Sequence, residues 1–166
     1  MLLFDGHLDL SMNSIDWDRN LDLGVYEIRA HEAGMTQKGR ARGTTTLPEM
    51  RRAEVGLSMA TVIKRTARPT DLPGHPGVAS QEISYGWAQG QLAYYRVLEA
   101  QGKVRMISDA AALAEHVAAW RSGGEGQPLG FILAMEGADP IVWPEQAAAW
   151  WDDGLRVVGP AHYGVS

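Results

Sequence analysis

The sequence contains no cysteine in its 166 residues. This absence excludes disulfide bonds and thiolate metal sites, so a metal ion could be bound only by histidine, aspartate and glutamate. Positive charge is also scarce: the formal net charge is −5 and the pI is near 5.5, which argues against a nucleic-acid-binding surface. No apolar run is long enough for a membrane span. The N-terminal apolar run is too short for a secretory leader, because it soon reaches Asp5 and His7. We therefore expect a cytoplasmic protein without a membrane span or a nucleic-acid partner.

The hydrophobic fraction of 45% is typical of a globular domain with a real core. Apolar stretches predict four β-strands, at residues 1–10, 55–63, 129–137 and 155–162. Helices are predicted over residues 80–101, where Gly102 follows as a stop, over 108–121, and after Pro144. Strands that are separated by helices and buried on both faces predict an α/β fold with a parallel sheet.

The first predicted strand ends in the run Asp5-Gly6-His7-Leu8-Asp9. Side chains alternate between the two faces of a strand, so His7 and Asp9 project in parallel from one face. Leu2, Phe4, Leu8 and Leu10 then share the opposite, apolar face, which we expect to lie under helices. An imidazole and a carboxylate at this spacing can reach one divalent cation, although the pattern taken alone is more often a simple hydrogen bond between the two side chains.

Polar residues also end two later strands: Glu136 ends the strand at 129–137, and His162 ends the strand at 155–162. In parallel α/β folds the ligand site lies at the C-terminal ends of the strands. His7, Asp9, Glu136 and His162 are therefore predicted to converge, although they are far apart in the sequence. Burial alone would not place charge at the same end of successive strands, so a metal site is predicted there.

A long segment, residues 11–48, separates the first two predicted strands. A helix is predicted over residues 21–33, and the basic stretch 36–46 reads as a loop. Its lysine and arginines could contact an anion over an active site, but we favour a solvated loop. Further along, His116 lies off the apolar stripe of its predicted helix and is expected at the surface.

Three stretches of the sequence resemble, in order and spacing, the membrane dipeptidase family (renal dipeptidase, peptidase M19). They are Asp5-Gly6-His7-Leu8-Asp9, Ala134-Met135-Glu136-Gly137-Ala138, and residues 154–162 (GLRVVGPAH). Residues 52–63 (RAEVGLSMATVI) are similar to the second strand of that family, and residues 91–107 to its following helix and strand. The resemblance covers nearly the whole chain, and the motifs are jointly specific.

The resemblance implies a zinc-dependent dipeptidase of the metal-dependent amidohydrolase type. It implies a (β/α)8 TIM barrel that holds two zinc ions and cleaves dipeptides through a metal-bound hydroxide. His7 and Asp9 would be ligands of one ion, Glu136 would bridge both, and His162 would contact the substrate. These roles suit the residue types: a bridging carboxylate holds two cations roughly 3.5–4 Å apart, and a neutral imidazole can donate to an oxygen that gains negative charge.

The family pattern also requires two more histidines, a late aspartate and an arginine, for which the chain has no counterpart. His31, His75 and His116 remain, and none ends a predicted strand. The chain supplies about four of eight βα units, where a complete barrel has about 250 residues. We therefore interpret residues 1–166 as a partial TIM-barrel metallohydrolase domain, truncated before its C-terminal half. It should support at most one zinc site and be inactive alone. The complete enzyme would act on a dipeptide or small amide, and it could form a homodimer.

Two alternatives stay open on the sequence. Another metal-dependent amidohydrolase, such as a deaminase or lactonase, shares the His-x-Asp pattern. Such enzymes usually carry a lysine or another bridge in place of Glu136, which favours a dipeptidase. The second alternative is a non-catalytic α/β domain that acts by association, and the incomplete ligand set agrees with it.

Overall fold

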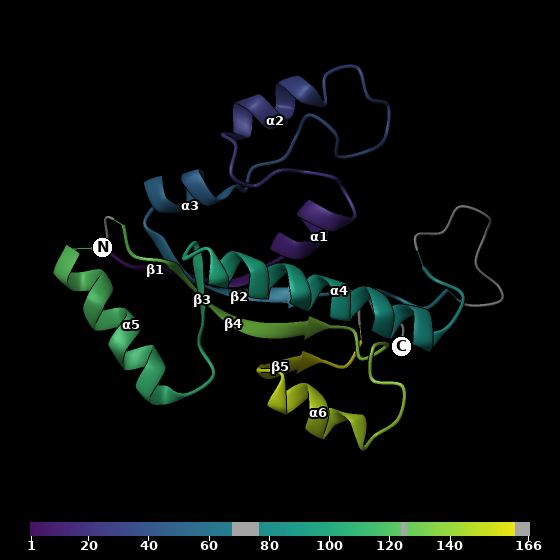
Figure 1. Ribbon diagram of the computed structural model, residues 1–166. Coiled ribbons are helices and arrows are strands. Elements are labelled where there is room, and N and C mark those ends of the chain that lie inside the picture. Colours follow the sequence, from purple (N-terminus) through teal and green to yellow (C-terminus); the bar gives the residue numbers. More distant parts are fainter. Residues whose placement is uncertain (68–76, 124–125, 162–166) are drawn as a thin grey trace.

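The computed structural model describes residues 1–67, 77–123 and 126–161. Its elements, in chain order, are β1 (Leu3–Leu8), α1 (Leu10–Ile15), α2 (Val25–His31), α3 (Leu47–Arg52), β2 (Val55–Val62), α4 (Gln81–Ala100), β3 (Val104–Met106), α5 (Ala110–Gly123), β4 (Leu129–Glu136), α6 (Gln146–Asp152) and β5 (Leu155–Gly159). Helices separate the strands from β2 onward, and the sheet lies among them (Figure 1). The predicted α/β class is confirmed.

The five strands form one parallel sheet. β1 pairs with β2, and β2 pairs with β4. The other side of β4 is shared: its first half pairs with β3, and its second half pairs with β5. The four longer strands β1, β2, β4 and β5 are therefore neighbours in chain order, as in consecutive βα units of a barrel. This arrangement is consistent with part of a (β/α)8 barrel.

Helix α4 covers one face of the sheet (Figure 1). It begins after Ser80, whose hydroxyl accepts the N–H of Ile83, and it ends before Gly102, which has a φ of +70° that suits glycine. Tyr95 of the helix stacks on Phe131 of β4, with 4.9 Å between ring centroids. Because side chains alternate along a strand, Thr61 and Glu136 project from the opposite face. The site is thus built on the face that α4 leaves open.

The apolar face predicted for the first strand is only partly correct. Leu10 is buried and Leu2 and Leu8 pack against the core, but Phe4 is 49% exposed. The pairing of β1 with β2 is irregular at two points, between Leu3 and Phe4 and between Asp5 and Leu8. These irregularities break the strict alternation on which the prediction relied.

The long segment between β1 and β2 also differs from its prediction. The helix predicted over residues 21–33 is shorter, since α2 begins after Gly24, whose N–H donates to the Glu27 carboxylate at 2.8 Å. Residues 21–23 instead form a turn that places Leu21 in the core. Helix α1, at Leu10–Ile15, was not predicted. Only Leu10 and Ser11 of it are buried, so the sequence shows no apolar stripe at helical spacing there.

The prediction of a surface position for His116 is wrong. The side chain is 2% exposed, and its Nε2 lies 2.7 Å from the carbonyl oxygen of Gly56. A Cβ at Gly130 would lie 2.5 Å from that Nε2, and a Cβ at Gly56 would lie 2.6 Å from the ring of Trp120. Two glycines in the sheet thus make room for two ring side chains of α5, and helical periodicity alone gives no sign of this.

We expect Gly130→Ala to lower the free energy of unfolding by about 1–3 kcal/mol, the usual cost of overpacking a core. The buried imidazole would have to move away from its carbonyl partner. Gly90→Ala is the matched control, because an added Cβ there meets nothing within 4 Å in the middle of α4. It should raise stability by about 0.5–1 kcal/mol. Denaturant unfolding of both variants checks this, and equal effects would contradict the packing described.

No helix in the described part of the chain is long and apolar enough to cross a lipid bilayer.

Candidate metal centre

Three of the four predicted site residues lie together at one end of the sheet. His7 Nε2 is 3.1 Å from Glu136 Oε2 and 3.5 Å from Asp9 Oδ1. One ligand atom from each residue lies within 4.8 Å of the other two. His7 and Asp9 come from the end of β1 and Glu136 is the last residue of β4, so the C-terminal strand ends meet as predicted.

The local structure explains how the three side chains are presented. Asp9 is the residue before α1, and its carbonyl accepts the backbone N–H and the side-chain amide of Asn13, at 3.1 and 2.7 Å. The His7 N–H donates to the Asp5 carboxylate at 3.0 Å. After Glu136 the chain turns at Gly137, which has a φ of +82°. Both strands therefore stop directly at the ligands.

Two of the three donor–donor distances are close to those found around a divalent cation. Ligands about 2.0–2.2 Å from a tetrahedral zinc ion lie roughly 3.3–3.6 Å from one another. The His7–Asp9 distance of 3.5 Å falls in this range, and the His7–Glu136 distance of 3.1 Å is slightly shorter. The side chain of His7 is 56% exposed, whereas those of Asp9 and Glu136 are 26% and 16% exposed. The group is thus partly sheltered and can be reached from solvent.

The fourth predicted residue, His162, lies outside the described residues, as does His75. The chain is described up to Ala161, and β5 runs beside the end of β4, with Gly159 opposite Glu136. The substrate role of His162 stays a prediction.

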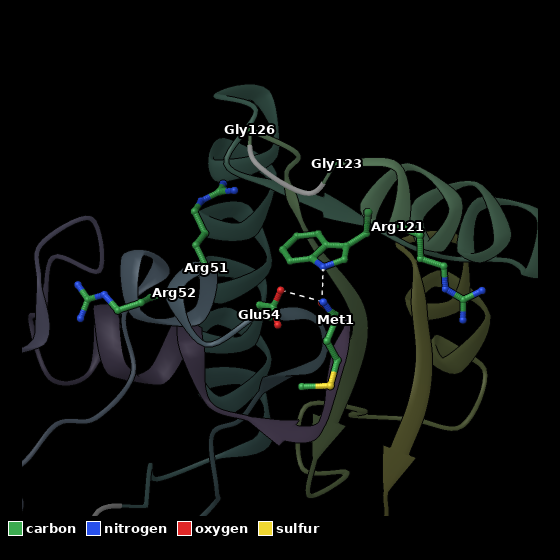
Figure 2. Close-up of a pocket in the computed structure, with 8 residues that line it drawn as sticks. Met1, Arg51, Arg52, Glu54, Arg121, Gly123 and Gly126 are labelled. Carbon is green, nitrogen blue, oxygen red and sulfur yellow. Dashed lines mark hydrogen bonds and ion pairs between the residues drawn. The ribbon is translucent and has the colours of Figure 1, made fainter.

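A pocket of about 670 Å³ lies at the opposite end of the sheet, next to residues that precede β1, β2 and β4. Arg51, Arg52 and Arg121 line it, but Figure 2 shows their side chains pointing in different directions. Arg51 donates to the carbonyls of Gln127 and Lys103, and Arg52 pairs with Glu49. Arg51 thus ties together the residues that precede β3 and β4, and the three guanidinium groups do not converge on one point.

The basic stretch 36–46 is not simply a solvated loop. Arg40 donates to the carboxylate of Glu32 at 2.9 Å, and Arg19 donates to both oxygens of the same carboxylate at 2.7 and 3.0 Å. Glu32 is 3% exposed and Arg19 is 9% exposed. Arg19 also donates to the side chain of Asn13 at 2.6 Å, so this ion network reaches the segment that follows Asp9.

The hydrogen bonds from Arg19 are the largest influence on Glu32 and lower the pKa of its carboxyl to about 2. Burial opposes them, while the Arg40 hydrogen bond and the N–H of Ala41 act in the same direction as Arg19. Glu32 is therefore ionised at neutral pH, and the charge is held by two cations rather than by water.

The sequence matches no protein-family model and no curated protein. Solved structures do match. One is the dipeptidase AC, a metallopeptidase of family M19, with a TM-score of 0.62 and 21% identity over 97% of this chain and 43% of that chain. A metallopeptidase from Rhodobacter sphaeroides, liganded with a phosphinate mimic of the dipeptide L-Ala-D-Ala, has a TM-score of 0.62 and 20% identity. The match covers 97% of this chain and 45% of that chain. The probable dipeptidase PvdM from Pseudomonas aeruginosa has a TM-score of 0.59 and 14% identity, and the match covers 99% of this chain and 35% of that chain.

The fold is that of part of an M19 metallo-dipeptidase. At these identities the likeness shows the fold alone, and the chain spans less than half the length of these proteins. The parallel sheet described above is consistent with part of such a barrel.

Proposed function

We propose that this chain is part of a zinc-dependent dipeptidase in which His7, Asp9 and Glu136 are metal ligands. The observation that carries the proposal is the convergence of these three donors at the C-terminal ends of two parallel strands. The likeness to solved metallo-dipeptidases supports it, because their fold is the one found here.

Each residue has a distinct part in the proposed chemistry. His7 and Asp9 would hold one ion, and Glu136, at the end of β4, would bridge to a second. A bound zinc ion supplies a Lewis acid that polarises a carbonyl oxygen and lowers the pKa of water. His162 would donate to the substrate oxygen, as the sequence predicts. The proposed substrate is a dipeptide or small amide, which agrees with the dipeptide mimic bound by the Rhodobacter sphaeroides protein.

The proposal assigns this chain one part of a larger site. One imidazole and two carboxylates are enough for a single zinc ion with an open position. A second ion would need donors beyond these three, and the described residues hold just this one group of candidate ligands. Dipeptide hydrolysis is therefore proposed for the complete barrel and not for residues 1–166 alone.

Other amidohydrolase activities and a purely associating domain are less well supported. A carboxylate at position 136 matches the bridge of the dipeptidases, whereas deaminases and lactonases usually use a lysine or another group. The convergence of His7, Asp9 and Glu136 favours a metal site over a domain that acts by association alone.

Metal analysis of the purified 166-residue chain tests the proposal. We expect at most about one zinc ion per chain, bound weakly, and no hydrolysis of L-Ala-D-Ala with added zinc. Two tightly bound ions would contradict the ligand count. A chain that binds no zinc, cobalt or manganese at millimolar concentration would overturn the assignment of the metal centre.

A further inference from the structure

A cluster of buried polar side chains lies directly beneath the candidate metal centre. Ser11 of α1, Thr61 of β2 and Tyr95 of α4 are each no more than 1% exposed. Polar groups are rarely buried so completely unless each has a hydrogen-bond partner. These three come from three different elements, and they meet where β1 leads into α1.

Hydrogen bonds join the cluster to the backbone around Asp9. The carbonyl of Thr61 accepts the hydroxyls of Ser11 and Tyr95, each at 2.8 Å. The N–H of Ser11 donates to the Tyr95 hydroxyl at 3.0 Å. Ser11 is two residues after Asp9, so these bonds fix the chain on the C-terminal side of the ligand against β2 and α4. The burial of Tyr95 raises the pKa of its phenol, which therefore stays a neutral donor.

Thr61 also contacts the ligand side chain itself. Its hydroxyl lies 2.5 Å from Asp9 Oδ1, the same oxygen that is 3.5 Å from His7 Nε2. An ionised carboxylate can only accept, so the threonine hydroxyl must be the donor. The β-branched side chain of Thr61 is stiff about χ1 and is held in a buried strand, so the direction of this hydrogen bond is fixed.

We propose that Thr61 is a positioning residue of the metal centre, whose hydroxyl orients the Asp9 carboxylate toward His7 and Glu136. The inference rests on the proposed function. Without this donor the carboxylate could rotate about its own side-chain bonds, and a metal ion would have to order it on binding. Outer-shell partners of this kind typically contribute about 10- to 100-fold in metal affinity. Thr61 lies in an uncharged strand run, where the sequence gives no hint of such a role.

The test is a Co²⁺ titration of the 166-residue chain and its variants, followed by the visible absorption of the bound ion. Thr61→Val removes the hydroxyl at nearly constant volume and should weaken Co²⁺ binding by about 10- to 100-fold with an altered spectrum. Thr61→Ser keeps the hydroxyl and should restore most of the affinity. A purely structural role for Thr61 would lower the melting temperature without this rescue of the metal spectrum.

Ser58→Ala is the matched control. Ser58 is a buried hydroxyl residue of the same strand, but it lies three residues before Thr61 and projects from the opposite face of the sheet. Its hydroxyl has no hydrogen-bond partner among the described residues. Its loss should leave Co²⁺ affinity unchanged. If Thr61→Val does not fold, Thr61→Ala is titrated instead.

The outcomes separate the two proposals. If the unsubstituted chain binds no Co²⁺, the metal centre itself is wrong, and the role of Thr61 falls with it. If the chain binds Co²⁺ and the valine or alanine variant binds equally well with the same spectrum, Thr61 does not position Asp9, and the metal proposal stands.

Discussion

Replacement of Glu136 by glutamine should abolish metal binding by this chain. Glutamine keeps the size of the side chain but loses the charge, and an amide is a poor ligand for zinc. His7 and Asp9 would then be left as two ligands on one strand end, without a donor from β4. We expect the affinity for Zn²⁺ or Co²⁺ to fall by more than roughly 100-fold, beyond the effect of losing an outer-shell partner. Isothermal titration measures this directly.

Glu145→Gln is the control for that experiment. Glu145 is an exposed residue just before α6 and is not part of the candidate ligand group, so the substitution makes the same change in net charge without removing a candidate ligand. It should bind metal like the unsubstituted chain. If Glu136→Gln retained full affinity while its fold was intact by circular dichroism, Glu136 would not be a ligand, and the likeness of this strand end to the dipeptidases would have no functional meaning.

The approach of His7, Asp9 and Glu136 could be predicted because it depends on strand periodicity and on one rule of parallel sheets. Once residues 1–10 and 129–137 are recognised as parallel strands, their C-terminal ends must lie at the same edge of the sheet. This requires no knowledge of side-chain packing. The regular βα order likewise followed from uncharged strand runs and a clear helix stop at Gly102.

The supports of the site could not be predicted in the same way. Thr61 lies in the run VGLSMATVI, and its hydroxyl can reach Asp9 only because β1 pairs with β2. His116 was misplaced because its burial depends on the absence of a side chain at Gly130 in β4. Contacts between residues far apart in sequence, with no repeating pattern, leave no mark that a single sequence can show.

The Arg19–Glu32–Arg40 network was also missed, because the basic stretch 36–46 gave the appearance of a solvated loop. We expect Glu32→Gln to lower the free energy of unfolding by about 3–5 kcal/mol, since two arginines would be left without their shared anion. The central guanidinium carbons of Arg19 and Arg40 lie 4.9 and 5.1 Å from the centre of the Trp17 ring, so the packing of Trp17 would loosen as well. Urea denaturation measures the loss.

Glu115→Gln is the matched control, because Glu115 pairs with Arg105 on the surface and such pairs contribute about 0–1 kcal/mol.

The pH dependence of the unfolding free energy shows whether the ionised Glu32 carboxylate is the source of the stability. The pKa of Glu32 is lowered from 4.5 to about 2 on folding, so its contribution is complete above pH 4.5 and is lost as the pH falls toward 2. The stability difference between the unsubstituted chain and Glu32→Gln should therefore shrink over that interval. A difference below about 1 kcal/mol at pH 7, or one that does not change on acidification, would show that the network does not hold the segment between β1 and β2 in place.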